Sequence, residues 1–454
     1  MIDNLDKQPI EIQATRLTEL ANSGDVDGLQ RLAAAGHPAD LSAAFAQLDE
    51  ELQLRLLELW PPQSVAELLL EIGGHLAVDY FADVPVERAA RAISVLDADE
   101  AADLLADIEP PLRERILAAA SRETAAEISD LLTYPEDSAG GRMSLDYVSV
   151  PERLTVGRAR GEVQQSIGDE QHINLYLTDD GARLVGVVFM ERLASAAADK
   201  PLRDLIETDY KTVGPAMDQE ELAALFQRYD LLAVPVTDDD GLLLGEVTVD
   251  DILDVLREEA TEDIFKMAAT SDEELEVRSA FSVVRLRLPW LLVCLLGALF
   301  SGTIIGLFSY AIEQVIALAG FIPVITAMGG NAGLQSSTVV VRNLALGRAE
   351  PKNILRSALR ELRVGALLGF FCGLIVGALA WAVGGNPMLG VVVGTAMVGA
   401  IIIATLVGAF MPLFFKRIGV DPALASGPFI TTANDIIGLT IYLGLGMLML
   451  DLLL

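Results

Sequence analysis

One carboxylate lies inside the last apolar stretch of the chain, residues 424–450. It belongs to Asp435, and the only other acidic residue nearby is Asp451, beyond the end of the stretch. An ionisable side chain at membrane depth costs about 2.5–3.5 kcal/mol or more, so it normally faces a partner or a water-filled pathway. Small or polar residues recur around it at helical spacing: Gly427, Thr431, Asp435 and Gly438. The pattern predicts a cation site lining a pore, and the alternative is a protonated carboxyl packed between helices.

A second apolar stretch, residues 315–341, carries two amides that share a helix face. Asn331 and Gln335 are four residues apart and stand among closely spaced glycines. Glycines at membrane depth permit close helix packing, or an unwound segment where it lines a cavity. The two interpretations are a polar lining for the predicted pore and a small-residue packing seam joined by amides, and they are compatible.

A single carboxylate per chain makes a sparse cation site. Dimerisation would place two copies of Asp435 across a symmetry axis, giving a ring of carboxylates suited to a divalent ion. Because Mg²⁺ gives up its water reluctantly, carboxylates that contact its water shell fit it better than an all-protein cage. If the chain dimerises, the pair of Asp435 carboxylates would thus suit a hydrated divalent cation such as Mg²⁺.

Acidic residues also recur along a predicted helix over residues 250–265, just before the apolar half of the chain. At about 100° per residue, four carboxylates fall within about 80° of one another: Asp251, Asp254, Glu258 and Glu262. The opposing face is apolar: Ile252, Leu256, Ala260 and Ile264. Like charges at this spacing destabilise a helix, and a bound divalent cation would reverse the effect. The two interpretations are a cation-sensing helix that acts on the pore and a solvated acidic face.

The charges of the 454-residue chain divide between two halves. The formal net charge is −33, although 52% of the residues are hydrophobic. Residues 281–454 hold ten basic and six acidic residues, which leaves a net −37 on residues 1–280. A nucleic-acid-binding protein would need basic patches on its soluble part, and a disordered one would need fewer apolar residues, so both classes are excluded. Because the three histidines are scattered and both cysteines lie in apolar runs, we expect neither an enzyme nor a disulfide framework.

Five apolar stretches are each long enough to cross a bilayer, which takes about 20 residues. They cover residues 289–312, 315–341, 361–385, 387–415 and 424–450. Basic residues stand only before the first stretch and on alternate connections: Arg278, Arg285, Arg287, Arg342, Arg348, Lys352, Arg356, Arg360, Arg363, Lys416 and Arg417. The positive-inside rule predicts a multi-pass protein of the cell (inner) membrane, with the amino terminus cytoplasmic and the carboxyl terminus external. The first ten residues have no signal-peptide core, which agrees with this orientation.

The first part of the acidic half reads as helical. Residues 5–132 predict short amphipathic helices without proline- or glycine-rich linkers. Residues 51–62 and 100–111 echo each other at a period of 49, which suggests a helical solenoid, and ordinary similarity between helix pairs is the alternative.

The second part of the acidic half predicts a repeated α/β pattern. Residues 173–188 and 231–247 each read as a strand, an acidic turn with glycine and a second strand, followed by a helix. The second copy resembles a CBS motif that ends in Thr248 and Asp250, whereas the first copy has Met190 there. Paired CBS motifs often bind adenine nucleotides, so ATP is a candidate ligand despite the divergent first copy.

Together these features resemble the MgtE family of magnesium channels over essentially the whole chain. Four local signatures carry the resemblance: residues 134–143, 259–264, 329–336 and 421–425. The resemblance implies a multidomain chain with an all-α superhelical amino-terminal domain, an α/β tandem CBS domain and an all-α transmembrane domain of five helices per subunit. The corresponding ranges are 1–135 for a Mg²⁺-sensing domain, 136–258 for the CBS pair, 250–283 for an acidic connecting (plug) helix and 284–454 for the pore.

The resemblance also implies roles for individual residues. Asp435 is similar to the family's pore aspartate, which selects hydrated Mg²⁺ with help from backbone carbonyls near Thr431 and Gly427, in a pore between two subunits. The Mg²⁺-sensing positions of the plug helix would be Asp251, Asp254, Glu259, Glu262 and Asp263, with Asp230, Asp97 and Asp99 in the other soluble domains. High cytosolic Mg²⁺ would bridge these acidic groups and close the pore, so Mg²⁺ is both transported ion and regulatory ligand.

Other functions remain open. The transported ion could be Co²⁺, Mn²⁺ or Ca²⁺, although a site for the bare ion would need more ligands than the sequence offers. A membrane-tethered Mg²⁺ sensor that conducts nothing, with Asp435 in a structural role, is a second alternative. A CBS-bearing anion transporter is disfavoured because the predicted pore residue is acidic.

Overall fold

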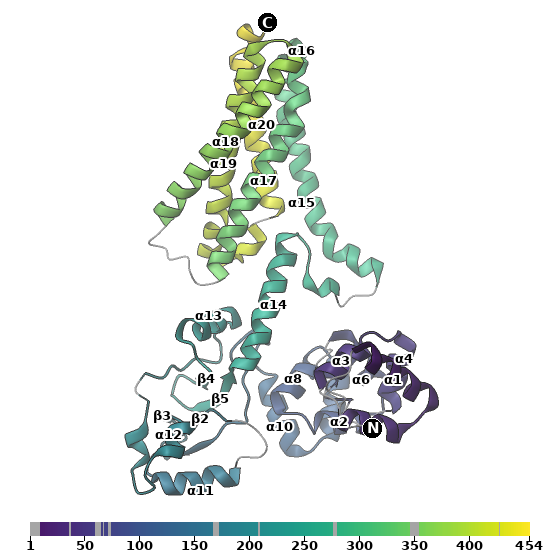
Figure 1. Cartoon of the computed structure of the whole chain (residues 1–454), viewed down its shortest axis with the longest axis vertical. Helices are drawn as coiled ribbons and strands as arrows, with labels where there is room; N and C mark the ends of the chain where they lie inside the picture. Colours follow the sequence, from purple (N-terminus) through teal and green to yellow (C-terminus); the bar gives the residue numbers. More distant parts are fainter. Residues whose placement is uncertain are drawn as a thin grey trace. The chain divides into compact units, whose positions relative to one another are not determined.

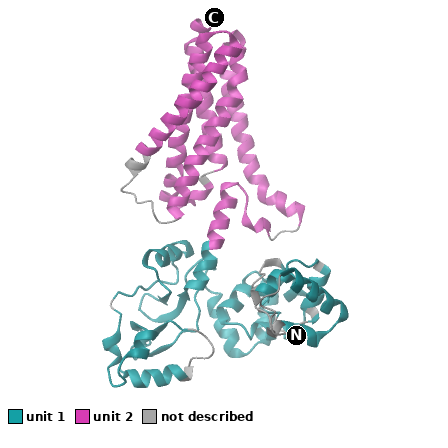
Figure 2. Ribbon diagram, viewed as in Figure 1, with its two compact units in different colours: residues 1–256 teal, residues 257–454 magenta. Residues whose placement is uncertain are grey.

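The computed structural model describes residues 10–35, 38–59, 65–66, 68–70, 74–166, 172–207, 209–275, 279–345, 354–425 and 427–454. The chain separates into two compact units, residues 1–256 (unit 1) and 257–454 (unit 2), coloured teal and magenta in Figure 2. The boundary falls inside one helix, α14 (Val249–Met267).

Unit 1 begins with a series of short helices (Figure 1). They are α1 (Ile10–Ser23), α2 (Val26–Ala35), α3 (Pro38–Phe45), α4 (Glu50–Leu59), α6 (Gly74–Asp83), α7 (Val86–Ile93), α8 (Ala98–Ala106), α9 (Pro110–Ala119) and α10 (Arg122–Leu131). Local capping sets their starts: the Ser121 hydroxyl accepts a hydrogen bond from Thr124 N at 3.1 Å ahead of α10. The predicted helical character is confirmed. In the 49-residue echo, residues 60–62 lie outside the described residues.

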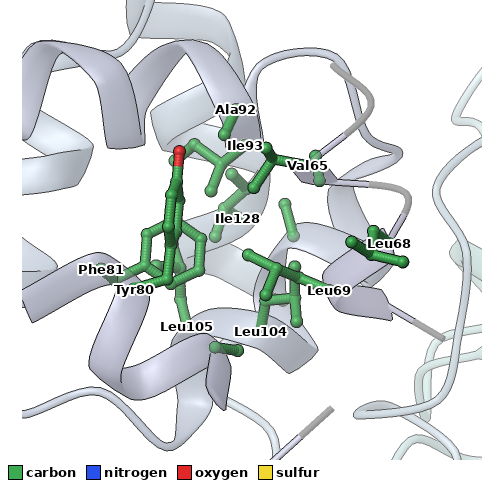
Figure 3. Packing of buried hydrophobic residues seen from close by; sticks show 14 of the residues in the cluster. Val65, Leu68, Leu69, Tyr80, Phe81, Ala92, Ile93, Leu104, Leu105 and Ile128 are labelled. Atoms are coloured by element: carbon green, nitrogen blue, oxygen red, sulfur yellow. The ribbon is translucent and has the colours of Figure 1, made fainter. Parts of the chain in front are cut away.

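Large apolar side chains form the core of this helical part (Figure 3). The rings of Tyr80 and Phe81, neighbours in α6, are both buried and meet edge to face with 5.4 Å between centroids. Aliphatic side chains from other helices contribute to the same core: Val65, Leu68, Leu69, Ile93, Leu104, Leu105 and Ile128. Because helices of this length are marginal in isolation, burial of these side chains supplies most of their stability.

The rest of unit 1 contains two small α/β copies. In the first, β1 (Ser149–Pro151) pairs parallel with β2 (Asn174–Thr178), which pairs antiparallel with β3 (Leu184–Phe189). In the second, β4 (Ala233–Thr237) pairs antiparallel with β5 (Leu243–Thr248), and a parallel bridge joins Val213 to Val236. The accompanying helices are α11 (Val156–Ser166), α12 (Met190–Ser195) and α13 (Gln219–Tyr229). Both predicted strand pairs are confirmed.

The two hairpins close with the same side-chain interaction. Asp179 Oδ1 accepts hydrogen bonds from the backbone N–H groups two and four residues later, at 2.8 and 3.0 Å. Asp238 Oδ1 does the same at 2.9 and 2.8 Å. The left-handed residue is Gly241 in the second turn and Ala182 in the first, so the first turn does not use its glycine for this purpose.

In the described part of unit 2, five helices are long and apolar enough to cross a membrane. They are α15 (Ala280–Leu307), α17 (Ala317–Ala345), α18 (Ile354–Gly384), α19 (Pro387–Arg417) and α20 (Pro428–Leu448), with the short α16 (Ser309–Gln314) and α21 (Leu450–Leu453) beside them. The five predicted spans are confirmed. Helix α18 begins before the predicted third stretch, so Glu361 lies inside the helix. Arg278, Arg348 and Lys352, which enter the orientation argument, lie outside the described residues.

Glycines bring the helices of unit 2 close together. A Cβ added at Gly373 of α18 would lie 2.6 Å from the Gly394 carbonyl oxygen of α19, so only glycine permits this approach. Helix α17 runs without interruption through Pro323 and its glycines. The alternative of an unwound segment in the second span was therefore wrong, and these glycines serve helix packing.

Candidate functional site

Helix α20 positions the predicted pore residues. Ile430, Asn434 and Gly438 form its buried face, whereas Asp435, one position further on, is half-buried. The carboxylate of Asp435 has no hydrogen bond or ion pair with any residue that the structure describes. It is therefore available to an ion or to water.

The remaining predicted pore groups of α20 are engaged with their own helix. Gly427 is the N-cap, and Pro428 opens the first turn. The Thr431 hydroxyl donates to the carbonyl oxygens of Gly427 and Pro428, at 3.2 Å each. The Gly427 carbonyl also accepts from the backbone N–H of Thr431 at 3.2 Å. Among the predicted pore groups of α20, the side chain of Asp435 is thus the acceptor that is not engaged with a described residue.

The two amides of α17 lie on the exposed side of that helix. Asn331 and Gln335 are exposed, and neither makes a hydrogen bond to a described residue. The buried face of the same segment consists of small residues: Gly329, Gly330, Ala332, Gly333, Ser336 and Ser337. The packing seam is therefore present, but Asn331 and Gln335 do not join it, which corrects that interpretation. Exposed amides on a helix of membrane length need a polar neighbour outside the single chain.

Within unit 2, the end of α14 lies against the segment that precedes α20. A Cβ added at Gly427 would lie 2.8 Å from the Met267 carbonyl oxygen. Lys266 Nζ contacts Asp421 Oδ2 at 2.5 Å and also forms an ion pair with Glu262, one turn earlier. Burial lowers the pKa of Lys266, but the bonds to Asp421 and Glu262 outweigh it, so its pKa lies above the ordinary value.

An excess of negative charge surrounds this lysine. Asp263 is partly buried beside Asp421 and Glu259, and burial followed by these two neighbours raises its pKa to about 6. One ammonium group therefore balances several carboxylates at the end of α14. A divalent cation bound here would neutralise more of this negative charge, and the ion pair between Lys266 and Asp421 would remain.

Unit 1 gathers carboxylates from separate segments into what we call the acidic cluster. Its members are Asp97, Asp99, Asp146, Glu246, Asp250 and Asp251, which are electrostatic neighbours of one another. Asp99 Oδ1 accepts a long hydrogen bond of 3.4 Å from the Ser144 hydroxyl. Asp251 Oδ2 accepts one of 2.8 Å from the Thr248 hydroxyl, which also fixes the start of α14. The structure thus brings the predicted residues of α8 and α14 together.

The acidic cluster binds protons more tightly than isolated carboxylates do. Burial, followed by the charge of Asp251, raises the pKa of Asp99 to about 7. Burial raises the pKa of Glu246 to about 7 as well, although a hydrogen bond from Tyr176 opposes the change. Burial also raises the pKa values of Asp97 and Asp251. A cation that binds here at neutral pH would therefore displace protons.

Three members of the acidic cluster were not predicted as site residues: Asp146, Glu246 and Asp250, of which Asp250 was noted only as the end of the CBS motif. Glu246 lies in β5 and is 4% exposed, and its Oε2 accepts a hydrogen bond of 2.5 Å from the Tyr176 hydroxyl. Its signal was an acidic residue in the middle of a predicted strand that is otherwise mostly apolar. Asp146, in the irregular segment before β1, carried no local signal.

The other predicted sensing residues are dispersed. Asp230 is exposed and adopts the left-handed conformation at the end of α13, and Asp254 and Glu258 are exposed on α14. Asp97, a member of the acidic cluster, is also the N-cap of α8, where its backbone N–H donates to Glu100 Oε2 at 3.3 Å. Among the residues that the structure describes, no group of three or more His, Cys, Asp or Glu side chains is arranged to hold a metal ion directly.

The predicted apolar face of α14 is only partly buried. Ile252 is buried, whereas Ile264 is 67% exposed, so within the single chain only part of this apolar face is covered. Leu253, outside the predicted face, is 62% exposed as well. Helical periodicity gives the residues that share a face but not the partner that the face meets.

Three stretches of the chain match models of known protein families. Residues 322–445 match the MgtE divalent cation transporter domain, and residues 36–137 match the MgtE intracellular N domain. Residues 202–258 match the CBS domain, which covers the second of the two α/β copies.

Similar full-length proteins are magnesium transporters. The chain is 35% identical over 445 residues to the magnesium transporter MgtE of Thermus thermophilus, covering 96% of this chain and 98% of the relative. It is 33% identical over 431 residues to the magnesium transporter MgtE of Bacillus subtilis, covering 95% and 96%. The corresponding protein of Enterococcus faecalis is 32% identical over 438 residues, covering 96% of each.

Two solved structures resemble the soluble part. One is the crystal structure of the soluble part of a magnesium transporter, with 31% identity and a TM-score of 0.51, covering 56% of this chain and 100% of that one. The other is the cytosolic domain of the Mg²⁺ channel MgtE in complex with ATP, with 32% identity and a TM-score of 0.50, covering 53% and 99%.

Proposed function

Because the chain belongs to the MgtE family of magnesium transporters, we propose that it is a Mg²⁺-selective channel that takes up Mg²⁺ and is closed by Mg²⁺ on the cytosolic side. The observation that carries this proposal is the half-buried carboxylate of Asp435 on a helix of membrane length, without a partner among the described residues. Such a group is retained at membrane depth when it faces an ion or water.

The pathway is completed by a second copy of the chain. The exposed amides of Asn331 and Gln335 need polar surroundings, and α17 packs directly against α20, which carries Asp435. A homodimer that faces these helices toward each other places two carboxylates and four amides around one aqueous path. Two carboxylates match the charge of a divalent cation that keeps its water shell, so Thr431 and Gly427 contribute only through atoms left free by their own helix.

Gating couples the acidic groups to this path. At low cytosolic Mg²⁺, the carboxylates of α14 and of the acidic cluster repel one another. At high Mg²⁺ the ion neutralises them, the soluble parts close together, and the end of α14 holds the segment before α20 in place. The contacts of Lys266 with Asp421 and of Met267 with Gly427 supply the mechanical link. In this arrangement further sensing carboxylates act where the two copies of the chain approach each other: Asp230, Asp254, Glu258 and Glu259.

The proposal also includes the orientation of the chain in the membrane and ATP as a second ligand. Basic residues on alternate connections place the amino terminus in the cytoplasm and the carboxyl terminus outside the cell membrane. ATP binds the CBS pair, by similarity to the solved ATP complex of a Mg²⁺ channel's cytosolic domain.

The direct test of the pathway is Mg²⁺ uptake into proteoliposomes that contain the full-length chain. We expect Asp435→Ala to abolish uptake and Asp435→Asn, which keeps the shape but not the charge, to reduce it at least tenfold. Uptake by both variants at the wild-type rate would contradict the assignment. Competition by Ca²⁺, Mn²⁺ and Co²⁺ in the same assay tests the alternative ion selectivities. If proteoliposomes with the wild-type protein take up no ion, the result would favour a sensor that does not conduct.

A further inference from the structure

The residue before the pore carboxylate is fully buried and polar. Asn434 is 2% exposed, and its Nδ2 donates a hydrogen bond of 3.3 Å to the Gly329 carbonyl oxygen of α17. A carbonyl inside a helix keeps a second lone pair after accepting its intrahelical bond, so it can accept this additional donor. The contact joins the two helices that the proposed pathway uses.

The amide sits in a notch that only glycine allows. A Cβ added at Gly333 of α17 would lie 2.0 Å from Asn434 Nδ2 and 2.8 Å from Ile430 Cγ2. Helix α19 lies directly behind the notch, because a Cβ added at Gly408 would lie 2.2 Å from the Gly333 carbonyl oxygen. This contact prevents α17 from moving away from the Asn434 amide. We call this site the amide notch, formed by Gly329 and Gly333 of α17 with Gly408 of α19 behind it.

The other half of the same amide has no partner. Asn434 Oδ1 is buried and accepts no hydrogen bond in the part of the chain that the structure describes. Turning the amide over would place two oxygen atoms together at Gly329, so the carbonyl fixes its orientation. An unsatisfied acceptor at membrane depth is costly, and a leucine of similar shape would avoid that cost. Retaining the amide therefore has to serve something other than stability.

The amide notch restricts the rotation of α20 about its own axis. Successive residues of an α-helix differ by about 100° around its axis and 1.5 Å along it. Once Asn434 is held at Gly329, the direction in which Asp435 leaves the helix is fixed. A purely apolar contact between two helices permits small rotations and shifts, because it has no directional bond.

We propose that Asn434 is a positioning residue for the pore carboxylate: its amide, held in the amide notch, fixes the rotation of α20 at which Asp435 meets the hydrated ion. The inference rests on the proposed function of Asp435 and extends it to ion selectivity. A water shell is recognised through distances, so a carboxylate that can rotate accepts hydrated ions of other sizes as well.

The test compares three full-length variants in proteoliposomes: Asn434→Leu, Asp435→Asn and Asn343→Leu. The last is the matched control, because Asn343 lies on α17 but donates to the carbonyl of Val339 in its own helix. The readouts are the Mg²⁺-to-Ca²⁺ flux ratio, the half-saturating Mg²⁺ concentration and the thermal unfolding midpoint in detergent. We expect Asn434→Leu to lower the flux ratio at least fivefold and raise the half-saturating concentration, while its midpoint stays within a few degrees of wild type.

Three results would overturn the inference. In the first, Asn434→Leu behaves like wild type in both the flux ratio and the half-saturating concentration. In the second, Asn434→Leu lowers the midpoint and the maximal flux but leaves the flux ratio and the half-saturating concentration unchanged, as expected of a residue that serves only packing. In the third, Asn343→Leu changes the ratio as much as Asn434→Leu does. If Asp435→Asn still reduces uptake at least tenfold in any of these cases, the proposed function stands and only the inference fails. Wild-type flux in both Asp435→Asn and Asp435→Ala would instead remove the proposed function itself.

A second pair of variants keeps the inference testable if Asn434→Leu does not fold. Gly333→Ala forces a Cβ into the amide notch, so we expect it to lower the flux ratio when Asn434 is present. In the Asn434→Ala background there is no amide to displace, and Gly333→Ala should change the ratio little further. Independent, additive effects of the two substitutions would contradict the inference.

Discussion

Single carboxylates of this chain occupy two contrasting environments. Asp435 is half-buried in unit 2 and has no partner among the described residues, whereas in unit 1 Glu246 is buried and Asp99 is partly buried, both beside other acidic groups. In the proposed function, the first carboxylate meets an ion that keeps its water shell and moves on through the pore. The second group would release protons when a cation binds, as the proposed regulation requires.

The raised pKa values of Asp99 and Glu246, both about 7, predict how stability depends on pH. The native state holds protons that the unfolded chain has already released, so their contribution is full below the unfolded pKa values near 4 and is lost as pH rises through 7. Without divalent ions, we expect the thermal midpoint of the full-length protein in detergent to be higher at pH 6 than at pH 8.

Added Mg²⁺ should then raise the midpoint more at pH 8 than at pH 6, because fewer protons have to leave. Asp99→Asn should weaken both dependences, whereas the same substitution at the exposed Asp107, at the end of α8, should leave them unchanged. A midpoint that rises between pH 6 and pH 8 in the absence of Mg²⁺ would show that the cluster is not protonated in this way.

Some candidate site residues stand out in the sequence because they break a pattern. Asp435 was evident as a lone charge in an apolar stretch, and Asp251 through its helical spacing. Glu246 and Asn434 were missed, since each is a buried polar group whose partner lies far away in the sequence. Only the fold shows that Tyr176 and Gly329 are those partners.

Helices of unit 2 are held together by glycine contacts, and one of these gives a test of the packing. Gly373→Ala would place a Cβ 2.6 Å from the Gly394 carbonyl oxygen, which is backbone and cannot move aside alone. We expect a loss of about 1–3 kcal/mol, measured as a lower thermal midpoint in detergent. Gly302→Ala, in α15, is the control: nothing lies within 4 Å of its added Cβ, so it should be neutral or slightly stabilising.

The end of α14 offers a second test at the level of elements. Lys266→Met keeps the length of the side chain but removes the charge that pairs with Asp421 and Glu262. Because this pair is only partly buried, we expect an effect of about 1 kcal/mol, which is a fivefold rise in the Mg²⁺ concentration that half-closes the channel. The measurement is Mg²⁺ uptake at graded Mg²⁺ on the side of unit 1.

Lys266→Arg is the control for this variant, since it retains the positive charge and should close within twofold of wild type. Closure of Lys266→Met at the wild-type concentration would mean that the ion pair does not link α14 to the segment before α20.

Element boundaries and faces were predictable to different degrees. The five spans and both strand pairs follow from hydropathy and alternation, which depend on the local sequence. The continuity of α17 did not follow, because glycines serve unwound and closely packed segments equally well. The exposure of Ile264 and of the α17 amides also escaped prediction, since periodicity does not identify what each face contacts.

Across the whole chain, the uneven charge now has a physical interpretation. The net −37 of residues 1–280 is a self-repelling surface, part of which is concentrated in the acidic cluster and along α14. The small positive excess of residues 281–454 comes from basic residues near one end of the predicted spans, and under the positive-inside rule it supports the proposed orientation with that end in the cytoplasm. In the proposed function, cytosolic Mg²⁺ lowers the repulsion, and the membrane part responds by closing.

Gating by Mg²⁺ is the central claim, and one measurement tests it most directly. Mg²⁺ uptake into proteoliposomes is followed as the Mg²⁺ concentration rises on the side of unit 1, for wild type and for a variant that combines Asp251→Asn, Asp254→Asn, Glu259→Gln and Glu262→Gln. We predict that wild-type flux falls steeply with rising Mg²⁺, whereas the combined variant continues to conduct. Closure of that variant over the same concentration range as wild type would contradict the account.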